Sequence, residues 1–129
     1  MTNRTWNILV IEDDPDGQDV VQRILKHHRI QFEAVYNAED GLAILGERQF
    51  DAAIVDLALP NLDGWGFLKA VQNNPATAQM PCVAVTAFHS AEVAVEAIRN
   101  GFLAYFPKPI DPTSFVRELD RVLTEALTS

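Results

Sequence analysis

The amino-acid sequence predicts an α/β domain in which helices cover both faces of a doubly wound, five-stranded parallel sheet. Five short apolar runs alternate with five amphipathic helical patterns along the 129 residues. The clearest runs are apolar at successive positions, as in strands that are buried on both faces of a parallel sheet. One helix between each two strands favours right-handed crossover connections.

The first strand and the first helix are predicted close to the N-terminus. Residues 8–11 form a continuous apolar run, and Asp14 with Pro15 supplies an N-cap followed by a proline in the first helical turn. We expect the buried face of this helix to consist of Val20, Val21, Ile24 and Leu25.

The middle of the chain is predicted to supply two more strands, each with its helix. The second strand fits residues 32–36, and the helix after it ends near Gly46. The third strand, residues 52–55, stops at Asp56, and residues 59–64 form a loop. The helix after this loop is marked by Phe67, Leu68 and Val71.

The fourth and fifth strands are predicted in the last third of the chain. Residues 82–85 run into Thr86, and Ser90 can cap a helix that Gly101 closes. The inward residues of this helix are expected to be Val93, Ala94, Ala97 and Ile98. The fifth strand is short, at about residues 104–106.

The final helix completes the predicted fold. Asp111 and Pro112 repeat the N-cap and proline start, and one face of the helix that follows is apolar. This stripe consists of Phe115, Val116, Leu119, Val122, Leu123 and Ala126. We expect the flavodoxin-like strand order 2-1-3-4-5 in a single domain over residues 1–129, with its core at about residues 6–127.

The composition excludes several classes of protein. The formal charge of −8 argues against binding nucleic acid, which would require a basic patch. No apolar stretch approaches the roughly 20 residues that cross a bilayer, so no membrane association is expected. The single cysteine, Cys82, cannot form an internal disulfide, and we expect a cytoplasmic protein.

Polar side chains gather at the predicted carboxyl ends of four strands. In a doubly wound sheet, ligands bind beyond these ends, where the strand order reverses between the first and third strands. The residues there are Glu12, Asp13 and Asp14 after the first strand, Asp56 after the third, Thr86 after the fourth and Lys108 after the fifth. The acidic triplet alone is equally compatible with helix capping in a solvated turn. The joint placement of all six residues indicates a site.

This cluster of acids is unfavourable unless a cation lies within it. Two carboxylates about 5 Å apart repel each other by roughly 3 kcal/mol at an effective dielectric constant of about 20. Because the candidate ligands are all oxygen atoms, the expected ion is magnesium, with manganese possible, rather than zinc.

The segments at these strand ends resemble those of response-regulator receiver domains of two-component signalling. The similarity rests on residues 8–14, 55–64, 85–87 and 108–109, and it extends over essentially the whole chain. The length resembles that of stand-alone regulators such as those of chemotaxis, so no output domain is expected. The resemblance implies a phosphoacceptor switch rather than an enzyme, with at most self-phosphorylation from small donors and slow self-dephosphorylation.

The resemblance also implies a role for each acid. Asp56 would accept a phosphoryl group from a sensor histidine kinase or a histidine phosphotransfer protein. Asp13 and Asp56 would bind magnesium directly, together with the backbone carbonyl of Ala58, and Glu12 would act through a metal-bound water.

The remaining pocket residues are implied to hold and transmit the phosphoryl group. Thr86 and Lys108 would bind phosphoryl oxygens, and Thr86 and Tyr105 would form the switch that changes a protein-docking surface on the fourth helix, fifth strand and fifth helix. Pro109 matches the cis-proline position of the family. Pro107 departs from the family's usual apolar β-branched residue, which leaves the shape of this surface open.

Two further residues of the pocket, Ala58 and Phe88, match positions that govern how readily water attacks the phosphoryl group. Neither side chain can hydrogen-bond a water molecule, and Phe88 is placed to cover the site, so slow self-dephosphorylation is expected. The sequence does not identify the kinase, the downstream protein target or the stimulus, and it is compatible with a monomer or a weak dimer.

Three alternatives remain at this point. The main one is a receiver-like module that binds proteins without being phosphorylated, although such modules usually lack an acid, the threonine or the lysine, all of which are present here. A metal-dependent phosphatase that forms an aspartyl phosphate would need a second acid where Ala58 stands. A flavin site would need a loop rich in glycine, serine or threonine in place of residues 12–14.

Overall fold

The computed structural model describes residues 6–128 of the chain. In this range five parallel strands form one sheet in the order β2-β1-β3-β4-β5, which confirms the predicted fold class and strand order. The strands are β1 (Asn7–Ile11), β2 (Gln31–Val35), β3 (Ala52–Asp56), β4 (Cys82–Thr86) and β5 (Ala104–Pro107). The helices are α1 (Pro15–His27), α2 (Ala38–Leu45), α3 (Gly64–Gln72), α4 (Ala91–Asn100) and α5 (Pro112–Thr128).

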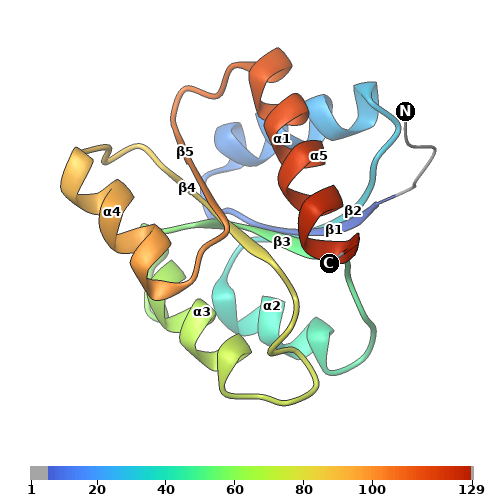
Figure 1. Ribbon diagram of the computed structural model, residues 1–129, viewed down its shortest axis with the longest axis vertical. Coiled ribbons are helices and arrows are strands. Elements are labelled where there is room, and N and C mark those ends of the chain that lie inside the picture. The colour runs from blue at the N-terminus through green and yellow to red at the C-terminus, as the bar shows by residue number, and fades with distance from the viewer. Residues whose placement is uncertain (1–5, 129) are drawn as a thin grey trace.

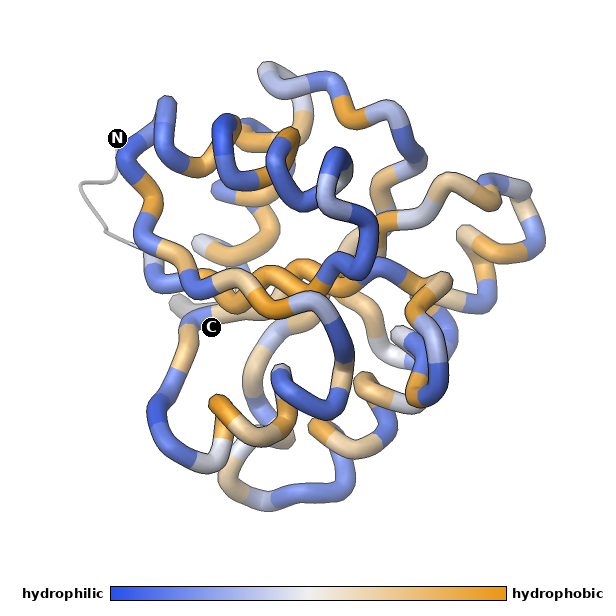
Figure 2. Tube along the Cα trace, turned by 180° about the vertical axis from the view of Figure 1, so that it is seen from behind, coloured by the Kyte–Doolittle hydropathy of each residue, from blue (hydrophilic) through white to orange (hydrophobic). Residues whose placement is uncertain are grey.

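The sheet lies between two layers of helices. Helices α1 and α5 cover one face, and α2, α3 and α4 cover the other (Figure 1). Strands β3 and β4 are buried at every position, because side chains on both faces of these central strands pack against helices. In the hydropathy view the apolar residues accordingly concentrate along the central strands (Figure 2). None of the helices within residues 6–128 combines the length and apolar character that a bilayer-spanning segment requires.

The predicted helix ends are confirmed by their hydrogen bonds. The carboxylate of Asp14 accepts a hydrogen bond from the backbone N–H of Gly17 at 3.2 Å. The hydroxyl of Ser90 accepts one from the N–H of Val93 at 3.1 Å. Gly101 closes α4 with φ = 116°, a left-handed conformation that glycine adopts without a steric penalty.

Two apolar residues that were expected to be buried are instead exposed. Val20 is 45% exposed, because α1 buries the stripe of Gln18, Val21, Ile24 and Leu25, and Val20 lies about 100° around the helix from Val21. Ile98 of α4 is 53% exposed, and Ala97 is the buried residue of that helix. Helix α4 lies over the edge of the sheet beside β5, so only a narrow stripe of its surface is covered.

Each of the five strands also differs by one residue from the prediction, at one end or at both. Strand β2 ends at Val35, and the following Tyr36 is 52% exposed. Strand β5 extends to Pro107, which is paired in register with Thr86. A proline is tolerated there because β5 is an edge strand and needs no N–H donor on its outer side.

Candidate functional site

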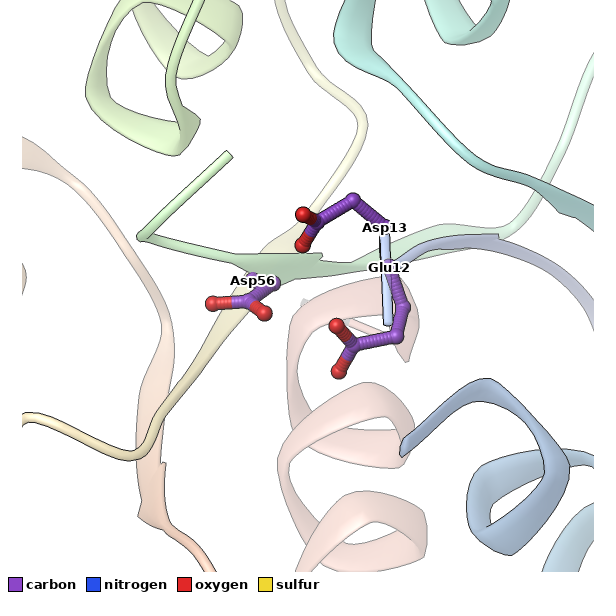
Figure 3. Close-up of side chains that lie close together, drawn as sticks. All are labelled: Glu12, Asp13 and Asp56. Carbon is purple, nitrogen blue, oxygen red and sulfur yellow. The ribbon is translucent and has the colours of Figure 1, made fainter. Parts of the chain in front are cut away.

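The carboxyl ends of β1 and β3 bring three acidic side chains together. These strands are neighbours with Ile11 paired to Val55, so that Glu12 and Asp56 leave the sheet side by side. One carboxylate oxygen each of Glu12, Asp13 and Asp56 lies within 4.8 Å of the others. Figure 3 shows these side chains extending from the two adjacent strand ends. Glu12 and Asp56 are buried, whereas Asp13 is exposed, so the cluster opens to solvent on one side.

Lys108 provides a positive charge inside this cluster. Its Nζ forms ion pairs with Glu12 Oε1 and with Asp56 Oδ2, the latter at 3.2 Å. The backbone N–H of Lys108 donates to the carbonyl of Thr86 at 2.9 Å, and the peptide bond between Lys108 and Pro109 is cis. This one ammonium group pairs with two of the three clustered carboxylates, so the pocket keeps an excess of acidic groups.

Backbone amides orient two of the acids. The N–H of Ala58 donates to Asp56 Oδ1 at 2.9 Å, which leaves Oδ2 for the lysine. The N–H of Asp14 donates to Glu12 Oε2 at 3.2 Å. Each buried carboxylate is therefore held by a local amide on one oxygen and by Lys108 on the other.

Burial makes the charge on Glu12 unfavourable. The pKa of Glu12 is raised from 4.5 to about 7, mainly by burial and further by the hydrogen bond and repulsion from Asp56, while Lys108 and the N–H of Asp14 oppose the shift. Burial works to lower the pKa of Lys108, but its contacts with Glu12 and Asp56 outweigh this and raise the pKa. The pocket thus holds acids that would be stabilised by a further cation.

The donor set fits a hard divalent ion. The three clustered ligand atoms are all carboxylate oxygens, and no histidine or cysteine belongs to the cluster within residues 6–128. Oxygen ligands of this kind suit magnesium, which needs few protein ligands because it keeps several waters.

Thr86 and Tyr105 lie on the neighbouring strands β4 and β5. Thr86 is buried at the end of β4, and its hydroxyl accepts a hydrogen bond from the N–H of Phe88 at 3.0 Å. Tyr105 is half-buried, and its hydroxyl lies 2.9 Å from Nδ1 of His89. The ring of Phe88 is 73% exposed, and Ala58 is exposed as well. The influence of Phe88 and Ala58 on phosphoryl lifetime stays a prediction.

One buried polar residue beside the site was missed at the sequence level. Gln18 is 2% exposed, and its amide contacts the backbone next to the acids. The only indication in the sequence is its spacing, because Gln18 stands three residues before Val21 and seven before Leu25, on the apolar face of the helix.

A family model for the response regulator receiver domain matches residues 8–120, which include every acid of the pocket and Lys108. The chain belongs to this family. Receiver domains are the phosphate-accepting modules of two-component signalling: they take phosphate from sensor kinases and bind Mg²⁺ at an acidic pocket. In this receiver domain, Glu12, Asp13 and Asp56 form an acidic cluster that could hold a metal ion.

Known proteins similar to this receiver domain include short and long chains. The 14.6 kDa protein in the sodA1 3′ region of Leptolyngbya boryana is 34% identical over 112 residues, which cover 86% of this chain and 85% of that protein. The transcriptional regulatory protein ZraR of Salmonella typhimurium is 34% identical over 118 residues, which cover 91% of this chain but 26% of ZraR.

Solved structures show the same fold. The CheY-like receiver domain protein of Methanospirillum hungatei superposes with a TM-score of 0.84 at 28% identity, covering 97% of this chain and 98% of that one. A response regulator of Chloroflexus aurantiacus gives a TM-score of 0.88 at 23% identity, covering 94% of this chain and 99% of that one.

Proposed function

We propose that this receiver domain is a switch in which Asp56 accepts a phosphoryl group from the phosphohistidine of a sensor kinase or of a histidine phosphotransfer protein. The observation that carries the proposal is the surroundings of Asp56. Its buried carboxylate contacts the ammonium of Lys108 and shares a cluster of ligand oxygens with Glu12 and Asp13. A nucleophile held beside groups that bind cations and anions is what phosphoryl transfer requires.

The residues of the pocket would divide the work of the transfer. A carboxylate oxygen of Asp56 forms a bond to phosphorus while the phosphorus–nitrogen bond of the donor histidine breaks. The N–H of Ala58 holds Oδ1 in place at 2.9 Å, and Lys108, which contacts Oδ2, is placed to bind a phosphoryl oxygen. The hydroxyl of Thr86, at the end of the next strand, would bind another.

The metal-binding residues are those that the resemblance to receiver domains implies, and three of them lie in the acidic cluster. Asp13 and Asp56 would hold magnesium directly, with the carbonyl of Ala58 as a third protein oxygen and Glu12 through a water. Magnesium bound there supplies positive charge that offsets the negative charge of the phosphoryl oxygens. Asp13, which is exposed, leaves this side of the pocket accessible to a phosphodonor.

The response would pass through Thr86 and Tyr105 to a docking surface on α4, β5 and α5. Thr86 turns toward the phosphoryl group, and Tyr105 leaves His89 and moves inward behind it. The exposed apolar residues Val95, Ile98 and Leu103, on α4 and on the connection to β5, support a protein-binding role for this surface.

Exposure to acetyl phosphate and Mg²⁺, followed by intact-mass measurement, tests the proposal. The parent protein is expected to gain the mass of one phosphoryl group in the presence of Mg²⁺ and to show no gain when a chelator replaces Mg²⁺. Asp56→Asn is expected to show no gain in mass. Phosphorylation of Asp56→Asn to the parent's extent would contradict the assignment. If the parent took up no phosphoryl group, the chain would instead be a receiver-like protein-binding module.

A further inference from the structure

Within residues 6–128, Gln18 is the one buried polar residue that the proposed chemistry does not use. Among residues 6–128, the polar or charged residues that are buried are Glu12, Gln18, Asp56 and Thr86. Three of these belong to the pocket. Gln18 lies near the start of α1, which follows the acidic residues 12–14. Because its amide is buried, it requires hydrogen-bond partners within the protein.

The side-chain amide of Gln18 joins three segments of the chain. Its Nε2 donates to the carbonyl of Glu12 at 3.2 Å and to the carbonyl of Val35 at 2.9 Å. Its Oε1 accepts a hydrogen bond from Nε2 of Gln22 at 2.9 Å. The carbonyl of Val35 also accepts the backbone N–H of Glu12 at 3.2 Å, so the amide closes a network that joins the ends of β1 and β2 to α1.

The orientation of the Glu12 carbonyl affects the positions of two acidic residues of the cluster. The carbonyl belongs to the planar peptide unit that links Glu12 to Asp13, and a planar peptide fixes the relative positions of the two Cα atoms. When the side-chain amide of Gln18 fixes this peptide plane, it therefore also restricts the directions in which the side chains of Glu12 and Asp13 leave the backbone. Repulsion among the acids works against their convergence, so a loop without this restraint would relax to separate them.

We propose that Gln18 is a positioning residue that holds the Glu12–Asp13 peptide so that both carboxylates face Asp56. The proposal rests on the proposed metal site and names a residue on which its affinity depends. Partners that orient metal ligands from outside the coordination shell change metal affinity by about 10- to 100-fold when they are removed.

A purely structural role makes a different prediction. If Gln18 only satisfied two buried carbonyls, its replacement would lower stability and leave the metal affinity of the folded protein unchanged. Gln22→Leu is a matched control, because it removes the other hydrogen bond of the same amide from a position one turn farther along α1.

The experiment compares the parent, Gln18→Leu and Gln22→Leu at a temperature where thermal unfolding curves show all three to be folded. Calorimetric titration with MgCl₂ is expected to show an affinity loss of about tenfold for Gln18→Leu and of less than about twofold for Gln22→Leu. In the metal-free protein, the amide hydrogen of Glu12 is expected to exchange faster in Gln18→Leu than in Gln22→Leu, since the side chain that ties the ends of β1 and β2 to α1 is absent and these ends can separate more often. Should Gln18→Leu not fold, Gln18→Asn takes its place, because its shorter amide cannot span both carbonyls.

Three results would overturn the inference. One is a folded Gln18→Leu that binds Mg²⁺ as tightly as the parent, and another is an equal loss of affinity in Gln22→Leu. With a parent that binds Mg²⁺ and accepts phosphate, either result removes the positioning role and leaves the proposed function intact. A parent protein that binds no Mg²⁺ would contradict both the positioning role of Gln18 and the proposed function.

Discussion

Glu12 is buried beside a second carboxylate and a lysine, so its protonation depends on what else occupies the pocket. Its pKa of about 7 in the folded protein lies above the ordinary value of 4.5, and the folded protein therefore binds this proton more tightly than the unfolded chain. The resulting stabilisation is complete below about pH 4.5 and is lost as the pH rises through about 7.

The variant Glu12→Gln tests this residue directly. Without metal, its free energy of unfolding is expected to match that of the parent near pH 4.5 and to exceed it by up to about 3 kcal/mol above pH 7, because glutamine cannot ionise. Urea denaturation in the presence of a chelator, at several pH values, measures the difference. Saturating Mg²⁺ should reduce this difference in the free energy of unfolding. A difference that is independent of pH would show that burial does not shift the pKa of Glu12.

At the scale of single elements, the start of α3 is fixed by the end of β3. The N–H of Gly64 donates to the carbonyl of Leu57 at 3.2 Å. A Cβ atom at Gly64 would lie 2.6 Å from the carbonyl oxygen of Asp56 and 2.7 Å from the Cα of Leu57. These are backbone atoms of the phosphoacceptor segment, and they cannot move without shifting it. At Gly66 a Cβ would instead meet Cδ1 of Leu62, a flexible side chain, at 2.5 Å.

Gly64→Ala and Gly66→Ala are therefore expected to differ. Overpacking against the backbone should lower the stability of Gly64→Ala by about 1–3 kcal/mol. Rotation of Leu62 and the better helix propensity of alanine should keep Gly66→Ala within about 1 kcal/mol of the parent. Denaturant unfolding measures both values. Equal losses in the two variants would refute the close approach of α3 to Asp56.

The elements that could be predicted are those set by local chemistry. Asp14, Ser90 and Gly101 begin or end helices through hydrogen bonds or backbone angles within a few residues. The exposure of Val20 and Ile98 could not be predicted, since it depends on how much of each helix the sheet covers. Apolar periodicity gives the direction of a buried stripe but not its width.

The site was predictable to the same degree. The acids and Lys108 meet because parallel strands end at one edge of the sheet, which the order of the elements implies. The role of Gln18 depends on two carbonyls from β1 and β2 that only tertiary structure brings together. The contact between Tyr105 and His89 likewise depends on the side-chain rotamers of a residue on β5 and a residue in the loop between β4 and α4.

At the scale of the whole molecule, the pocket and the docking surface are connected through the carboxyl edge of the sheet. Asp56, Thr86 and Tyr105 lie on three successive strands, β3, β4 and β5. The buried central strands are packed on both faces, so a response is expected in side chains and loops rather than in the sheet itself.

Thr86→Ala should separate phosphorylation from this response. The variant is expected to be phosphorylated at Asp56 but to leave the Tyr105 ring beside His89, because the hydroxyl that would turn toward the phosphoryl group is absent. NMR signals of the Tyr105 ring, assigned with Tyr105→Phe, should shift on phosphorylation in the parent and stay unchanged in Thr86→Ala. The same shift in both proteins would exclude Thr86 as the connection.

The proposed metal site requires that the acids at the carboxyl ends of β1 and β3 bind one divalent ion between them. Asp13→Asn and Asp14→Asn each remove one negative charge at adjacent positions, but only Asp13 belongs to the cluster, and asparagine caps α1 as well as aspartate does. Calorimetric titration with Mg²⁺ compares them most directly. We predict an affinity loss of more than about tenfold for Asp13→Asn and of less than about threefold for Asp14→Asn. Equal losses would mean that Mg²⁺ responds only to the general negative charge, and would contradict the shared site.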